Sequence, residues 1–141
     1  MRKSPRTKLR VLIAEDENLT RRVLKATIER WQYEVVVAAN GLEAWEILRQ
    51  PQAPRMAVLD STMPGVDGIT LCRELRRLAP EPYIYILLLA VQDPEQEMAK
   101  ALEAGADDYM TKPFYPEELK ARLRAGRRIL ESRDQCLVEA R

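Results

Sequence analysis

Four charged residues follow short apolar runs of the chain: Glu15 and Asp16 follow the first run, Asp60 the third and Lys112 the fifth. Three carboxylates gathered in one site repel one another unless a cation binds between them, and oxygen ligands suit Mg²⁺. The ion would offset the acids' charge, so that Asp60 could attack a phosphoryl group and form an acyl phosphate. Lys112 would hold a phosphate oxygen. The residue types therefore indicate Mg²⁺-dependent phosphorylation of Asp60, if the fold brings the four together.

Asp60 taken alone is open to a second interpretation. It lies within the stretch MAVLDSTMPGVDG, residues 56–68, where an apolar run gives way to Pro64 and Gly65. Asp and Pro-Gly are common turn residues, so Asp60 could simply open a turn. The stretch itself favours neither interpretation, and the elements around it must decide.

Five apolar runs alternate with five segments of helical periodicity, which predicts an α/β fold with one parallel sheet covered by helices on both faces. Asn18 and Asp93 are the expected N-caps of the first and fourth helices. The predicted strands cover residues 9–14, 35–39, 56–59, 83–89 and 108–111, and the predicted helices cover 19–31, 42–48, 69–78, 94–104 and the segment from 116 onward.

The order of the strands decides whether the charged residues meet. In a doubly wound, flavodoxin-like sheet with strand order 2-1-3-4-5, the first and third strands are neighbours and the fifth lies two strands from the third. The carboxyl ends of parallel strands share one edge, where such sheets bind ligands. We therefore expect Glu15, Asp16, Asp60 and Lys112 to converge on one crevice.

Composition restricts the class of protein. The chain has 141 residues, a net charge of +1, 46% hydrophobic residues and 32% charged residues, as is typical of one soluble domain. Residues 1–10 carry five basic side chains and no acid, and we expect residues 1–7 to form a flexible basic tail. The body that remains is acidic, which argues against nucleic-acid binding by this domain.

Other residue types bear on location and chemistry. Cys72 and Cys136 lie far apart without metal-ligand spacing, as in reduced cytosolic proteins. No apolar run is long enough to span a bilayer, so we expect a cytoplasmic protein that does not bind a membrane. The chain contains no histidine, which excludes histidine-based catalysis and histidine metal ligands within it.

Three pieces, VLIAEDE, VLDSTMPGVDG and EAGADDYMTKPF, resemble the receiver domain of bacterial two-component response regulators over residues 8 to about 130. The resemblance implies a phosphoprotein rather than an enzyme. A phosphohistidine on a sensor histidine kinase or phosphotransfer protein would give its phosphoryl group to Asp60. Mg²⁺ would be held by Glu15 or Asp16, by Asp60 and by the backbone carbonyl of Thr62. Lys112 would precede a cis peptide bond at Pro113.

The same resemblance assigns a switch to two further positions. Tyr109 matches an aromatic residue whose ring moves inward on activation, on the face formed by the fourth helix, fifth strand and fifth helix; alternatively, it is a tyrosine packed at a strand end. Ala90 departs from the family, whose members usually have Thr or Ser there to bind the phosphoryl group. The missing hydrogen bond is worth roughly 1.5–3 kcal/mol. Val91, where a small residue is usual, could crowd Asp60.

Two other functions are compatible with these residues. The departure at Ala90 suggests a receiver-like dimerisation or docking module that is weakly coupled to phosphorylation. A Mg²⁺-dependent phosphatase with an aspartyl-phosphate intermediate shares the nucleophile and the lysine, but such enzymes commonly carry a second Asp where this chain has Thr62. We therefore favour the phosphoryl-accepting receiver.

The last helix continues beyond the predicted body. A heptad-like pattern could form a homodimer seam, as could the face of the fourth helix, fifth strand and fifth helix; alternatively, the helix frays after Leu130. Residues 131–141 are expected to be a helical extension or a linker toward an output domain outside this chain. The seam residues are Leu119, Leu123, Gly126, Leu130, Arg133 and Leu137.

Overall fold

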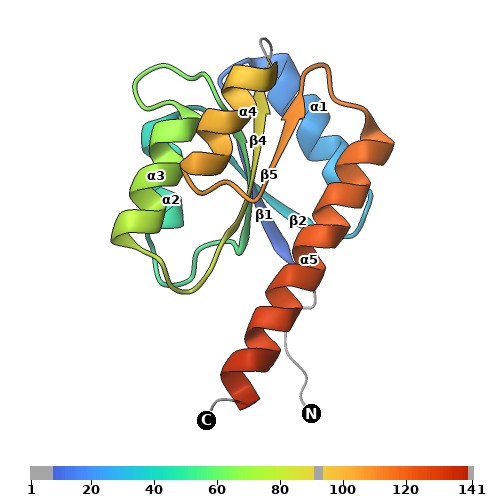
Figure 1. The fold of residues 1–141 in the computed structure, drawn as a ribbon. Helices are drawn as coiled ribbons and strands as arrows, with labels where there is room; N and C mark the ends of the chain where they lie inside the picture. Colours follow the sequence, from blue (N-terminus) through green and yellow to red (C-terminus); the bar gives the residue numbers. More distant parts are fainter. Residues whose placement is uncertain (1–7, 91–93, 140–141) are drawn as a thin grey trace.

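The computed structural model describes residues 8–90 and 94–139, with the backbone alone for residues 94 and 136–139. The expected tail 1–7, Val91 and the expected N-cap Asp93 lie outside the described residues. Five parallel strands form one sheet in the order β2-β1-β3-β4-β5, which confirms the predicted flavodoxin-like topology (Figure 1). In the described part of the chain, no helix is both long enough and apolar enough to cross a membrane.

The elements alternate as the sequence predicts, and most boundaries lie within about two residues of their expected places. The strands are β1 (Arg10–Ala14), β2 (Glu34–Ala38), β3 (Met56–Asp60), β4 (Tyr85–Ala90) and β5 (Asp108–Thr111). The helices are α1 (Asn18–Glu29), α2 (Gly41–Leu48), α3 (Gly68–Leu78), α4 (Pro94–Glu103) and α5 (Pro116–Glu139).

Helices cover both faces of the sheet (Figure 1), and an apolar layer lies between the sheet and each group of helices. Helices α2, α3 and α4 pack on one face, and helices α1 and α5 pack on the other. Alternate residues of each strand supply the two layers, so that Val58 faces α1 and α5 while Leu59 faces the opposite helices. Every residue of β3 and β4 is buried, as expected of central parallel strands.

Hydrogen bonds extend the sheet one residue beyond three of its strands. The backbone N–H of Glu15 donates to the carbonyl of Ala38 at 3.1 Å, and that of Lys112 donates to the carbonyl of Ala90 at 2.7 Å. After β3, the N–H of Ser61 donates to a β4 carbonyl at 2.7 Å. The backbone is therefore held at the point where each charged side chain leaves the sheet.

The N-cap of α1 is Glu17, so the prediction that Asn18 caps this helix was wrong. Asn18 is already the first helical residue, whereas Glu17 keeps an extended backbone and its side chain accepts a hydrogen bond from the N–H of Thr20 at 2.6 Å. The longer Glu side chain reaches the free N–H from one position earlier. Asn18 instead accepts a hydrogen bond from the side chain of Arg21.

Helix α5 packs its apolar stripe on its own sheet. Leu119, Leu123 and Leu130 are buried in the layer shared with α1, so the prediction that these leucines form a homodimer seam was wrong. The helix continues to Glu139 instead of fraying after Leu130. Leu137 lies among the residues whose side chains are not described.

Contacts with the body hold the distal part of α5. The Arg133 guanidinium lies 3.6 Å from the centre of the Tyr83 ring, and Asp134 forms a 3.2 Å ion pair with Arg55. Closer to the sheet, the Tyr85 hydroxyl donates to the carbonyl of Arg122 at 3.1 Å. The extension predicted for residues 131–141 therefore begins as a helix attached to the domain.

Gly126 permits the close approach of α5 to the sheet. A Cβ at this position would lie 2.5 Å from the ring of Tyr85. We expect Gly126→Ala to destabilise the domain by about 1–3 kcal/mol, because overpacking a core outweighs the better helix propensity of alanine. Urea unfolding gives the measurement. The control Ala121→Gly, at an exposed site of the same helix, should cost about 1 kcal/mol through helix propensity; a stabilised Gly126→Ala protein would contradict the packing argument.

Candidate functional site

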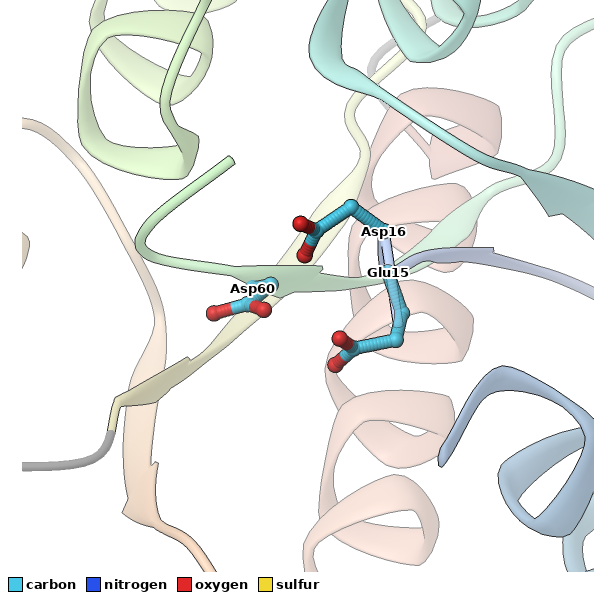
Figure 2. A group of neighbouring side chains, drawn as sticks. All are labelled: Glu15, Asp16 and Asp60. Carbon is cyan, nitrogen blue, oxygen red and sulfur yellow. The ribbon is translucent and has the colours of Figure 1, made fainter. Parts of the chain in front are cut away.

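Three acids lie together at the carboxyl edge of the sheet, as the sequence predicts. Carboxylate oxygens of Glu15, Asp16 and Asp60 all lie within 4.8 Å of one another, and we call these residues the acid cluster (Figure 2). Glu15 and Asp16 leave the end of β1, and Asp60 is the last residue of the neighbouring strand β3. Glu15 and Asp60 are buried, whereas Asp16 is exposed.

Lys112 bridges the two buried members of the acid cluster. Its Nζ donates to Glu15 Oε1 at 2.8 Å and to Asp60 Oδ2 at 2.9 Å. The side chain enters from the end of β5, and the peptide bond between Lys112 and Pro113 is cis, as the family resemblance implied. The structure therefore brings Glu15, Asp16, Asp60 and Lys112 together in one site, as the sequence predicts.

The electrostatics of the site follow from sharing one ammonium group between two carboxylates. Burial raises the pKa of the Glu15 carboxyl, and the charge of Asp60 raises it further, although hydrogen bonds from Lys112 and from the Glu17 N–H oppose this shift. Burial lowers the pKa of the Lys112 ammonium, but its hydrogen bonds to both carboxylates outweigh burial and raise it overall. The lysine is well stabilised, whereas the acids retain an excess of negative charge.

Two hydrogen bonds orient the Asp60 carboxylate. Oδ2 accepts from Lys112, and Oδ1 accepts from the backbone N–H of Thr62 at 3.2 Å. Thr62 therefore lies in the loop beside the acid cluster, where the resemblance places a metal ligand; the role of its carbonyl stays a prediction. The Asp60 carboxylate is thus held in one orientation through both of its oxygens.

The donor set of the acid cluster fits a hard divalent cation. Three carboxylates converge, all ligand atoms are oxygen, and one member is open to solvent, so a bound ion could keep water ligands. This combination suits Mg²⁺ better than metals that prefer nitrogen or sulfur ligands.

The two predicted switch residues lie outside the acid cluster. Ala90 ends β4 and is buried; its backbone carbonyl binds the N–H of Lys112, while its methyl group offers no hydrogen-bond donor. Tyr109 lies on β5 and is only 6% exposed, within the apolar layer that also contains Ala90, Ala101 and Ala104. The tyrosine is therefore packed inward in this structure.

Arg21 is a site residue that the sequence analysis did not single out. Its guanidinium donates to the carbonyl of Glu15 at 2.8 Å, beside the acid cluster. A signal was present, because arginine in the first turn of a helix is opposed by the helix dipole. An arginine at such a position is therefore expected to bind a nearby group of the protein rather than to extend into solvent.

Comparisons with known proteins place the site in a family. The family model for the response regulator receiver domain matches residues 11–124. The chain is 42% identical over 125 residues to "Probable transcriptional regulator ycf27" of Cyanophora paradoxa, covering 89% of this chain and 51% of that protein. It is 39% identical over 116 residues to the alkaline phosphatase synthesis transcriptional regulatory protein PhoP of Bacillus subtilis, covering 82% and 47%.

A solved structure gives the same result. The receiver domain of Francisella response regulator 1452 superposes with a TM-score of 0.76 at 31% identity, covering 90% of this chain and 99% of that one. The chain spans about half the length of the curated relatives it matches.

Buried negative charge in the acid cluster should cost stability when no metal is bound. The pKa of Glu15 is raised on folding, so the folded state loses stability as the pH rises above 4.5, the ordinary value, and through the raised pKa. We expect Glu15→Gln to be more stable than the parent by roughly 1 kcal/mol at pH 7 in EDTA, and the difference to shrink toward pH 4.5.

Urea unfolding at the two pH values measures this effect. Glu103→Gln, which removes an exposed acid from α4, is the matched control and should change stability little at either pH. A Glu15→Gln protein that is less stable than the parent at pH 7 would show that the Lys112 ion pair outweighs the cost of burial.

Proposed function

Because the chain belongs to the response regulator receiver family, we propose that it accepts a phosphoryl group on Asp60 from a histidine kinase or phosphotransfer protein. The observation that carries the proposal is the contact of Lys112 with both Glu15 and Asp60 at the carboxyl edge of the sheet. In this proposal the chain works in the cytoplasm as the acceptor of the group, and not as an enzyme.

The proposed step forms one bond and breaks another. A carboxylate oxygen of Asp60 attacks the phosphorus atom, and the bond from phosphorus to the partner's imidazole nitrogen breaks, with its electron pair returning to the ring. Lys112 is close enough to Asp60 to donate a hydrogen bond to a transferred phosphoryl oxygen. A Mg²⁺ ion in the acid cluster would offset the negative charge that keeps carboxylate and phosphoryl group apart.

The three acids would hold that ion in different ways. Glu15 already accepts hydrogen bonds from Lys112 on Oε1 and from the Glu17 N–H on Oε2. Asp16 is exposed, and no described residue hydrogen-bonds its carboxylate, so its oxygens are the more available ligands. We assign Asp16, Asp60 and the Thr62 carbonyl as direct ligands, and Glu15 as the acid that links the ion's surroundings to Lys112.

Phosphorylation should depend on Asp60 and on Mg²⁺. We expect acetyl phosphate, or a cognate kinase, to label the parent in Mg²⁺ but not in EDTA, and Asp60→Asn to abolish labelling because an amide is not a nucleophile. Mass spectrometry of the intact protein detects the added group.

The control is Asp67→Asn, which changes the N-cap of α3. Asp67 accepts a hydrogen bond from the N–H of Thr70, and Asn serves equally well at an N-cap. This variant should be labelled like the parent. An unlabelled parent in Mg²⁺, or an Asp60→Asn protein labelled as well as the parent, would contradict the proposed function.

The response to phosphorylation is a separate matter, and Ala90 favours a second candidate function. Because its methyl group cannot bind a phosphoryl oxygen and Tyr109 is already buried, the face of α4, β5 and α5 could serve as a docking or dimerisation surface whose state changes little. The two candidates share the chemistry at Asp60. They differ in how much the face of α4, β5 and α5 changes when Asp60 is phosphorylated.

A restored hydroxyl should strengthen the response. We expect Ala90→Thr to increase the change produced by the phosphoryl analogue beryllium fluoride, because one hydrogen bond to a charged group is worth roughly 1.5–3 kcal/mol, about ten- to a hundredfold in a two-state equilibrium. Amide NMR shifts of β5 and α4, together with light scattering for the oligomeric state, measure it.

Ala90→Val is the control, since it has the shape of threonine without the hydroxyl. It should respond like the parent. Equal responses of Ala90→Thr and Ala90→Val would show that the hydroxyl is not the missing element.

A further inference from the structure

The guanidinium group of Arg21 binds the backbone of the loop that carries Glu15 and Asp16, two members of the acid cluster. Arg21 Nη1 donates to the carbonyl of Glu15 at 2.8 Å and lies 3.4 Å from the carbonyl of Asp16. Its Nη2 donates to Asn18 Oδ1 at 2.7 Å. One side chain from the first turn of α1 therefore reaches back across the whole connection between β1 and the helix.

This arrangement is not explained by helix stability. The N-terminal end of a helix carries partial positive charge, so a cation in its first turn is unfavourable. Lysine or arginine on a solvated helix face would normally extend into water, as Arg22 does: it is exposed and has no hydrogen bond or ion pair to the described residues. Arg21 instead is partly buried and turns toward backbone carbonyls.

Glu15 and Asp16 depend on Arg21 to different extents. The Glu15 side chain has its own partners, Lys112 and the N–H of Glu17. Among the described residues, none hydrogen-bonds the Asp16 carboxylate, so its position is determined by its backbone alone. The contacts of Arg21 with that backbone therefore add to the ladder hydrogen bond from the Glu15 N–H to Ala38, and together they hold the exposed acid near Asp60 and Glu15.

We infer that Arg21 is a positioning residue for the divalent cation of the acid cluster, acting through the backbone of residues 15–16 to preset the Asp16 carboxylate. The inference rests on the metal site of the proposed function. Residues that orient metal ligands from behind typically contribute about ten- to a hundredfold to metal affinity.

An electrostatic role and a positioning role of Arg21 predict opposite effects of its substitution on Mg²⁺ affinity. A positive guanidinium near the site repels Mg²⁺, so a purely electrostatic role would make Arg21→Ala bind the ion more tightly. A positioning role makes the same variant bind it more weakly. Arg21→Lys keeps the charge but cannot reproduce the planar fork that reaches several acceptors at once, so positioning predicts weaker binding here too.

The experiment measures Mg²⁺ affinity directly, by isothermal titration calorimetry on the complete chain. We expect the Kd for Mg²⁺ to rise about tenfold in Arg21→Ala and by a smaller factor in Arg21→Lys. Arg22→Ala is the matched control, because it removes the same charge from the neighbouring position of the same helix; its Kd should stay within about twofold of the parent's. Thermal unfolding in EDTA verifies that each variant folds.

Phosphorylation by acetyl phosphate supplies a second readout. In Arg21→Ala, labelling should require more Mg²⁺ for half its maximal rate but recover the parent's rate when Mg²⁺ saturates, which a general loss of structure would not produce. A Kd unchanged or lowered in Arg21→Ala, or a rise of the same size in Arg22→Ala, would overturn the inference.

Failure of the inference and failure of the proposed function are distinguishable. A parent that binds Mg²⁺ but is never labelled contradicts phosphorylation of Asp60 and leaves the metal result for Arg21 valid. A labelled parent whose Mg²⁺ affinity does not depend on Arg21 overturns the inference alone. A parent that does not bind Mg²⁺ overturns both the metal site and the role of Arg21.

Discussion

One ammonium group shared by two buried carboxylates is the interaction on which the site depends. Glu15 is 1% exposed and Asp60 is 4% exposed, and burying two like charges side by side is costly unless a cation lies between them. Lys112 supplies that cation, yet a single positive charge cannot balance three acids. The excess negative charge is what suits the site to a divalent ion, which the proposed phosphorylation of Asp60 requires.

The fold can hold this arrangement because the charged residues begin where the sheet still constrains the backbone. Ladder hydrogen bonds extend past β1, β3 and β5, so each side chain starts from a fixed point. The loop after β3 then closes tightly on itself: a Cβ at Gly68 would lie 2.3 Å from the carbonyl oxygen of Asp60. This close approach requires glycine at the start of α3, and it keeps the acid's own backbone covered.

The fold class and the four charged residues could be predicted from the sequence, because alternating periodicity determines the fold class and charged side chains lie at strand ends. The strand order followed from the flavodoxin-like topology expected of that class. Details that depend on how far a side chain reaches could not be predicted from the sequence. Glu17 replaces Asn18 as the cap of α1 because a longer side chain serves from one residue earlier. The leucine stripe of α5 has the spacing of a dimer seam, but only the structure shows that Tyr85 and the sheet cover it. Arg21 has the spacing of a solvated residue, and its contacts are visible only in three dimensions.

The proposed chemistry and the proposed response have different structural requirements. Asp60 is the last residue of β3, whereas Glu15 and Asp16 follow β1 and Lys112 follows β5. Ala90 contributes only its carbonyl, so the pocket can be complete without a hydroxyl there. If Asp60 is phosphorylated, Lys112 has to exchange a carboxylate oxygen for a phosphoryl oxygen. Lys112 directly follows β5, which carries the buried Tyr109, and α5 begins at Pro116. In the proposed function, Lys112 therefore links the acid cluster to β5 without involving the side chain at position 90.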